Sequence, residues 1–158
     1  MNIELKNIKL KDKNKFDKLL QLYLHDLALY YPAPFNYEIL EYTYDNIEKY
    51  YDNDLSYFIV YDKNIVGFIL LDNNLKDNYE ISEIFILNQF KRMGIGQKVV
   101  NMILDMYKGS WTIKAVPNST VAESFWLHTI KKYTNNNFKI SRTGKYNRLE
   151  LYFNNKEE

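Results

Sequence analysis

The residues best suited to chemistry lie in a short glycine loop between a predicted strand and a predicted helix. Residues 79–87 are rich in β-branched and aromatic side chains, and from Ile95 onward apolar residues recur at helical spacing. Between them stands the basic stretch FKRMGIG, residues 90–96. The first N–H groups of a helix lack intrahelical acceptors and the helix N-terminus is positive, so this order predicts a cradle for a phosphate group.

The same loop argues against two common nucleotide sites. It lacks the Gly-Lys-Ser/Thr ending of the nucleotide triphosphatases and the third glycine of the dinucleotide-binding folds. A tight turn that merely enters a core helix is the alternative, because one Gly-x-Gly pair is common in a chain of this size.

Residues 90–96 resemble the pyrophosphate loop of the GNAT N-acetyltransferases, Gln/Arg-x-x-Gly-x-Gly/Ala, which follows a strand and opens a helix. Asn118 with Ala122, Phe125 and Trp126 resembles the family's later Asn and its Ala-x-x-Phe/Leu-Tyr helix. This helix carries Phe-Trp in place of Phe-Tyr, and in this it is similar to the helix of a poorly characterised bacterial subgroup of the family. The resemblance covers nearly the whole chain. It implies a GNAT-like fold, acetyl-CoA as co-substrate, and transfer of the acetyl group to an amine.

The resemblance also assigns a coenzyme A site. Backbone N–H groups of the loop would surround the pyrophosphate, two cations would add charge, and the preceding strand would pair with the pantetheine arm. The residues implied are Ile84, Phe85, Ile86, Lys91, Arg92, Met93, Gly94, Ile95, Gly96, Gln97, Asn118, Phe125 and Trp126. Lys91 stands where Gln or Arg is usual, and an ammonium still meets phosphate.

The implied reaction is attack of an amine on a thioester, which needs an oxyanion donor and a base. By alignment the N–H of Ile84 or of a neighbouring residue is the donor. Glu80 and Glu83 are the candidate bases that remove the amine proton, and either is alternatively a plain surface charge. Because they are three apart on a strand, we expect them to point to opposite faces, so that at most one faces the cleft.

Other catalytic groups are restricted by what the chain contains. Trp126 stands where many family members carry a tyrosine acid, and an indole cannot release its proton at physiological pH, so solvent is expected to protonate the departing thiolate. With no cysteine, no thiol carries a covalent acetyl group, and we expect direct transfer in a ternary complex. His25 and His128 are too few and too scattered for a metal site, so no metal is predicted.

An aromatic segment after the first predicted helix is the candidate acceptor wall. It comprises Tyr30, Tyr31, Phe35 and the tyrosines of residues 37–51, with acidic residues between them that would attract a cationic amine. A simple cover of the core explains the segment equally well. The acceptor is expected to be a small molecule or a peptide amine.

The elements that position these residues are read from periodicity. Helices are predicted over 16–27, 95–107 and 122–133, with Gly109 ending the second, and strands over 2–9, 55–61, 65–71, 79–87, 111–116, 138–140 and 149–153. Residues 72–78 are expected to form a turn and 156–158 a frayed tail, while 37–53 fits either a short helix or a loop. This order predicts one α/β (α+β) domain over residues 1–158, a mixed sheet flanked by helices.

Composition bounds the remaining possibilities. The chain has 158 residues, a formal charge of +1 and no cysteine, which disfavours nucleic-acid, membrane and disulfide-stapled secreted classes. No signal peptide or membrane-spanning stretch is apparent, so a cytoplasmic location is expected, as a monomer or homodimer. The alternative to an acetyltransferase is a non-catalytic acyl-CoA-binding or regulatory module, motivated by the missing tyrosine.

Overall fold

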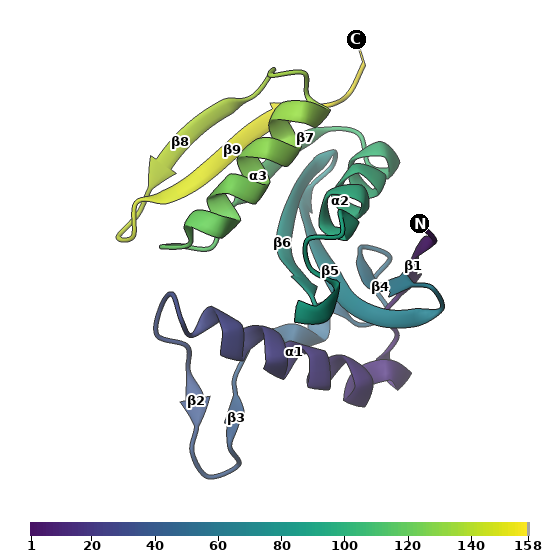
Figure 1. The fold of residues 1–158 in the computed structure, drawn as a ribbon, viewed down its shortest axis with the longest axis vertical. Coiled ribbons are helices and arrows are strands. Elements are labelled where there is room, and N and C mark those ends of the chain that lie inside the picture. Colours follow the sequence, from purple (N-terminus) through teal and green to yellow (C-terminus); the bar gives the residue numbers. More distant parts are fainter. Residues whose placement is uncertain (158) are drawn as a thin grey trace.

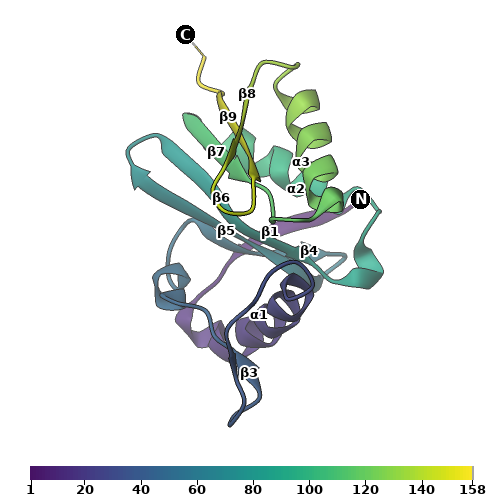
Figure 2. The same ribbon diagram turned by 90° about the vertical axis from the view of Figure 1, so that its left-hand side faces the viewer.

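The structure is a computed structural model that describes residues 1–157, and a mixed sheet forms its centre. Within these residues seven strands pair in the order β1-β4-β5-β6-β7-β9-β8. In that order they are Ile3–Asn7, Ser56–Tyr61, Asn64–Leu75, Asn78–Ile86, Ser110–Lys114, Arg148–Asn154 and Lys139–Thr143. Figures 1 and 2 show one helix on one face of this sheet and two on the other. The predicted mixed sheet flanked by helices is therefore confirmed.

The helices bury apolar stripes on the two faces of the sheet. They are α1 (Lys13–Leu27), α2 (Ile95–Met106) and α3 (Thr120–Tyr133). The stripe of α1 packs against phenylalanines of β4, β5 and β6, whereas α2 and α3 pack against the opposite face. At the start of α3, the Ser119 hydroxyl accepts a hydrogen bond from the Ala122 N–H at 3.1 Å. Among the described residues, no helix is long and apolar enough to cross a bilayer.

The segment 37–53 forms neither a regular helix nor a plain loop. A small hairpin pairs β2 (Phe35–Asn36) with β3 (Glu41–Tyr42), and a 3-10 turn, η2 (Ile47–Tyr50), follows. Leu40 and Asn46 have positive φ values of 58° and 59°, a conformation that interrupts a helix. Figure 1 shows the hairpin projecting away from the sheet.

Two expected boundaries are wrong, for local reasons. β5 continues to Leu75, so the turn expected over 72–78 is confined to residues 76–77. α2 ends at Met106 before it reaches Gly109. Gly109 is needed elsewhere, because a Cβ there would lie 2.1 Å from the Asp77 carbonyl oxygen. Of the expected tail, residue 158 lies outside the described residues, and Lys156 forms an ion pair with Asp77 at 3.1 Å.

Strands β6 and β7 are parallel neighbours that separate part-way along their length. They pair from Asn78–Ser110 to Ile81–Ile113, and β6 then continues alone on that side to Ile86. Figure 1 shows the two strands diverging at this point. The far half of β6 therefore presents an unpaired backbone edge beside the start of α3.

A β-bulge in β6 changes which side chains share a face. Ile81 packs with α2 and α3 but Phe85, four residues on, packs with α1. Regular alternation would put both on one face, and the register shift opposite Leu70 and Leu71 supplies the extra residue. As a result Glu80 and Glu83 both lie on the α1 face, so the expectation that they point to opposite faces is wrong.

Candidate active site

The loop after β6 presents backbone donors at the N-terminus of α2. A 3-10 turn, η3 (Asn88–Phe90), leads into it, and Gly94 caps the helix with a φ of 82°. The first hydrogen bond of α2 runs from the Lys98 N–H to the Gly94 oxygen at 3.1 Å. The N–H groups of residues 95–97 therefore lack intrahelical acceptors and, with the helix macrodipole, favour an anion.

Positive side chains flank these donors. Lys91 and Arg92 are both exposed, as is Met93. Within residues 1–157 neither cation makes an ion pair, so both charges are available to a phosphate group.

The two glycines of the loop serve different purposes. A Cβ added at Gly94 would meet no heavy atom within 4 Å, so its positive φ is what requires glycine. A Cβ at Gly96 would lie 3.1 Å from the Phe125 ring and 3.4 Å from Cδ1 of Ile86. Gly96 thus brings α2, α3 and β6 close together, and places the loop beside the unpaired edge of β6.

The unpaired edge of β6 carries the N–H groups expected to meet the acyl donor. The Leu87 N–H donates to the Val66 oxygen in β5 at 2.8 Å. Since backbone groups alternate in direction along a strand, the N–H groups of Ile84 and Ile86 point away from β5. They are directed to the side where β6 and β7 separate. The backbone N–H of Phe85 is instead directed to β5, and the Phe85 ring is buried against α1.

Glu83 lies on β6 two residues beyond the last β6–β7 pair and is partly buried. It accepts hydrogen bonds from the Tyr23 hydroxyl and, at 3.3 Å, from the Tyr44 hydroxyl. Burial raises the pKa of Glu83 to about 7, although the two tyrosine hydrogen bonds oppose that rise. A carboxylate with a pKa near neutrality, beside the Ile84 N–H, has the properties of a general base.

The Tyr23 hydroxyl positions this carboxylate, so Tyr23→Phe is expected to alter its titration. Loss of a hydrogen bond to the charged form raises the pKa of Glu83 further. The midpoint of kcat/KM against pH should move upward, with a lower rate at pH 7 and nearly full recovery at alkaline pH. Steady-state rates from pH 5.5 to 9.5 measure this. A midpoint that stays in place contradicts the positioning role.

Glu80 is differently placed on the same face. Its Oε1 pairs with the Lys114 Nζ in β7 at 3.4 Å, within the part of β6 that still pairs with β7. Glu80 therefore neutralises a lysine and lies further from the separated edge than Glu83 does.

The α3 residues implied by the resemblance take distinct positions. Phe125 contacts the loop as described and stacks edge-on with Trp126, with ring centroids 5.0 Å apart. Trp126 is only 5% exposed and packs in the core between the sheet, α2 and α3. Asn118 donates through Nδ2 to the Tyr30 oxygen at 2.9 Å, so it links the start of α3 to the end of α1.

A cavity of about 400 Å³ lies on the α1 face next to these elements. It is lined by Tyr31, Lys114, Pro117, Thr143, Gly144, Lys145, Tyr146, Arg148 and Glu150. Of the predicted acceptor residues only Tyr31 lines it. The Tyr30 side chain does not, and Phe35 packs against Tyr37 and Tyr42 in the projecting hairpin. The acidic residues expected to attract an amine, Glu38, Glu41, Asp45 and Glu48, are exposed and do not line this cavity.

Sequence comparison identifies the family. A model of the acetyltransferase (GNAT) family matches residues 18–128 of the chain. The chain belongs to the GNAT family. No curated protein matches the chain in sequence. This GNAT protein therefore uses acetyl-CoA as co-substrate to acetylate an amine, as the resemblance of residues 90–96 to the family's pyrophosphate loop implies.

Three solved structures share the fold at low identity. Diaminobutyrate acetyltransferase EctA from Paenibacillus lautus, in complex with L-2,4-diaminobutyric acid and coenzyme A, is 11% identical, with a TM-score of 0.68 over 98% of this chain and 95% of that chain. An acetyltransferase from Thermus thermophilus is also 11% identical, with a TM-score of 0.68 over 98% and 97% of the two chains. Arabidopsis thaliana Naa50 is 16% identical, with a TM-score of 0.56 over 96% and 97%.

Several residues around the GNAT site are not apparent from the sequence alone. Tyr23 is indistinguishable from its apolar neighbours on α1, and the only signal is that a buried tyrosine hydroxyl needs a partner. Arg148 and Glu150 alternate with buried leucines on β9. The alternation shows that the two side chains lie on the same side of the sheet, but it does not show which residues they contact. Within residues 1–157 no group of three or more His, Cys, Asp or Glu side chains is arranged to hold a metal ion.

Proposed function

We propose that this GNAT protein transfers an acetyl group directly from acetyl-CoA to a small amine in a ternary complex, with Glu83 as the general base. The observation that carries the proposal is the position of Glu83, a carboxylate whose pKa is raised to about 7 on the half of β6 that does not pair with β7. It stands beside the outward N–H of Ile84, and the cavity lies on the same face.

The residues present fit coenzyme A. No heavy atom lies within 4 Å of the position that a Cβ of Gly94 would take, so a ligand can approach the backbone there. The helix that Gly94 caps has three N–H groups without intrahelical acceptors, and Lys91 and Arg92 lie beside it. The edge N–H groups of Ile84 and Ile86 match amides of an extended arm. Phe125 and Ile86 form an apolar wall between loop and strand. Acetyl-CoA, when bound, supplies a thioester carbonyl as the acyl donor.

Each residue then has one task. Glu83 accepts a proton from the ammonium group of the acceptor, and the Tyr23 and Tyr44 hydroxyls hold its carboxylate in place. The Ile84 N–H donates to the oxygen on which negative charge develops. The amine nitrogen bonds to the thioester carbon, the carbon–sulfur bond breaks, and the second nitrogen proton passes to solvent. Trp126 is buried and cannot give up a proton, so the leaving sulfur takes its proton from solvent.

The experiment measures free coenzyme A released from acetyl-CoA by the purified protein, with and without a panel of amino acids, polyamines, aminoglycosides and peptides. Release that depends on one class of amine, with mass-spectrometric detection of the acetylated amine, is the expected result. Tight coenzyme A binding without amine-dependent release across the panel contradicts the proposal and favours a binding module.

The setting of the protein is part of the same proposal. The lack of cysteine and the near-neutral net charge support a single cytoplasmic domain without a nucleic-acid partner, as a monomer or homodimer. Size-exclusion chromatography with light scattering distinguishes the two assemblies.

A further inference from the structure

We propose that the acceptor is an amine that also carries a carboxylate, and that Arg148, supported by Lys114 and Lys145, binds this carboxylate in the cavity on the same face of the sheet as Glu83. The inference rests on the acetyl-transfer function proposed above and specifies its substrate class.

The cavity has an excess of positive charge. Three cationic residues, Lys114, Lys145 and Arg148, line it with one carboxylate, Glu150. Glu150 is 8% exposed and accepts a hydrogen bond from the Tyr152 hydroxyl, while Lys114 is paired with Glu80 at 3.4 Å. Once these two carboxylates are counted against the three cations, one positive charge is left to be matched by a ligand.

Arg148 is built to present a guanidinium group. Its Nε donates to the Ala115 oxygen at 2.7 Å, which anchors the side chain to the end of β7. Within residues 1–157 its two terminal nitrogens donate to no protein acceptor and form no ion pair. A guanidinium fixed through Nε offers its paired terminal N–H groups to a carboxylate in two parallel hydrogen bonds.

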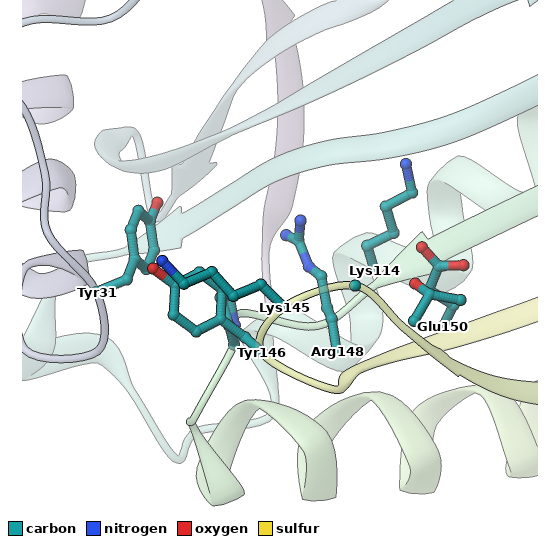
Figure 3. A pocket seen from close by; sticks show the side chains of 9 residues that line it. Tyr31, Lys114, Lys145, Tyr146, Arg148 and Glu150 are labelled. Atoms are coloured by element: carbon teal, nitrogen blue, oxygen red, sulfur yellow. The ribbon is translucent and has the colours of Figure 1, made fainter.

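Figure 3 shows how the cations are arranged. Arg148 stands between Lys114 and the Lys145–Tyr146 tip of the β8–β9 hairpin, and its guanidinium points away from β9 in the same general direction as the Lys114 amine. Tyr31 lies across the cavity from Lys114. Arg148 and Lys114 therefore present their positive groups to the same side, while the Lys145 amine lies at the hairpin tip toward Tyr31. The cavity they line has a volume of about 400 Å³, a size suited to an amino acid rather than to a folded partner.

The charge of Arg148 reaches the proposed base, although the two groups form no ion pair. Its charge acts to lower the pKa of both Glu83 and Tyr31, so the three groups share one electrostatic environment. No Arg148–Glu83 contact within 4.0 Å occurs among the described residues. A molecule with its amine at Glu83 and its carboxylate at Arg148 satisfies both groups. A simple polyamine would instead bring positive charge to an already positive cavity.

The test compares matched acceptors. L-amino acids with a primary amine on the side chain, their carboxamides, the corresponding decarboxylated diamines and phosphoethanolamine are assayed for acetyl-CoA-dependent coenzyme A release. We expect kcat/KM for an amino acid to exceed that for its amide by about 10- to 100-fold, as for loss of hydrogen bonds to a charged group. Amides or diamines used as well as the acids overturn the inference, and so does a preference for phosphoethanolamine, which would assign the cavity to phosphate.

Variants of two arginines on one hairpin localise the effect. Arg148→Gln should raise KM for the amino acid about 10- to 100-fold and leave KM for the amide within about twofold. Arg148→Lys keeps the charge but loses the paired N–H groups of the guanidinium, so its KM for the amino acid should lie between those of the unmodified protein and Arg148→Gln. Arg142→Gln is the matched control, because Arg142 pairs with Glu123 at 2.9 Å outside the cavity. An acid-to-amide preference that survives in folded Arg148→Gln and Arg148→Lys proteins overturns the assignment.

A binding measurement separates this inference from the proposed function. Melting of the coenzyme A-loaded protein is followed with the same compounds. If no amine is acetylated but the amino acids raise the melting temperature in an Arg148-dependent manner, the transferase proposal fails and the carboxylate site stands. If amines are acetylated without regard to the carboxylate, the function stands and the inference fails. If the protein shows no turnover and no Arg148-dependent stabilisation, both the transferase proposal and the carboxylate site are overturned.

Discussion

Glu83→Gln is expected to lower kcat/KM for acetyl transfer by about 10²- to 10⁴-fold, the usual contribution of a positioned general base. Gln keeps the size of the side chain and can still accept from Tyr23, but it cannot remove a proton. In the unmodified protein kcat/KM should rise with pH to a plateau, with a midpoint near the Glu83 pKa of about 7. The variant should lack this rise. Steady-state rates from pH 5.5 to 9.5 measure both effects.

Stability distinguishes lost chemistry from lost structure. In the folded protein Glu83 holds its proton up to about pH 7, whereas in the unfolded chain it releases the proton near its ordinary value of 4.5. The folded state binds more protons in that window, so the contribution of Glu83 to stability falls as pH rises from about 4.5 to 7. Glu83→Gln removes this penalty, and its melting temperature relative to the parent should be higher at pH 8 than at pH 5.

Glu80→Gln is the matched control for the base. Glu80 lies on the same strand and the same face, but its carboxylate is paired with Lys114. The pH midpoint near 7 should persist in this variant. If Glu80→Gln abolishes the midpoint while Glu83→Gln retains it, the two assignments are reversed, and if neither changes it, a carboxylate base on β6 is excluded.

Gly94→Ala is expected to weaken coenzyme A binding by about tenfold or more. At a φ of 82° an L-residue is strained by about 1–2 kcal/mol, so the loop relaxes and the N–H groups of residues 95–97 lose their common direction. Each tenfold loss of affinity corresponds to about 1.4 kcal/mol, which the strain and one weakened hydrogen bond to phosphate can supply. Calorimetric titration with coenzyme A gives the dissociation constant.

Gly144→Ala provides a control with the same backbone strain. Gly144 has a φ of 76° in the β8–β9 turn, and a Cβ there would also meet no heavy atom within 4 Å. Both variants should lose a similar amount of stability, yet only Gly94→Ala should lose affinity for coenzyme A. Equal affinities of the two variants would remove the assignment of the loop as the pyrophosphate site.

Local patterns were sufficient wherever neighbours in the chain decide the structure. The stripe of α1, the hairpin of β4 and β5, and the passage from β6 through a glycine loop into α2 are encoded over short distances, so periodicity predicts them. The order of these elements then predicts a mixed sheet, and FKRMGIG points to the family that the comparison confirms. The individual site residues stay predictions, with the glycine loop the best supported by geometry.

The arrangement of the acceptor side depends on contacts between distant segments. Tyr23 and Glu83 are 60 residues apart, and the bulge that turns Glu83 toward α1 depends on the register between β5 and β6. The tyrosine-rich segment is mostly a hairpin and core cover, while Arg148 and Lys114 reach the cavity because β9 pairs with β7. Periodicity shows that side chains share a face, but only packing decides what they face. Sequence therefore specifies the glycine loop and its place before a helix, and tertiary structure decides the environment of Glu83 and the charge of the cavity.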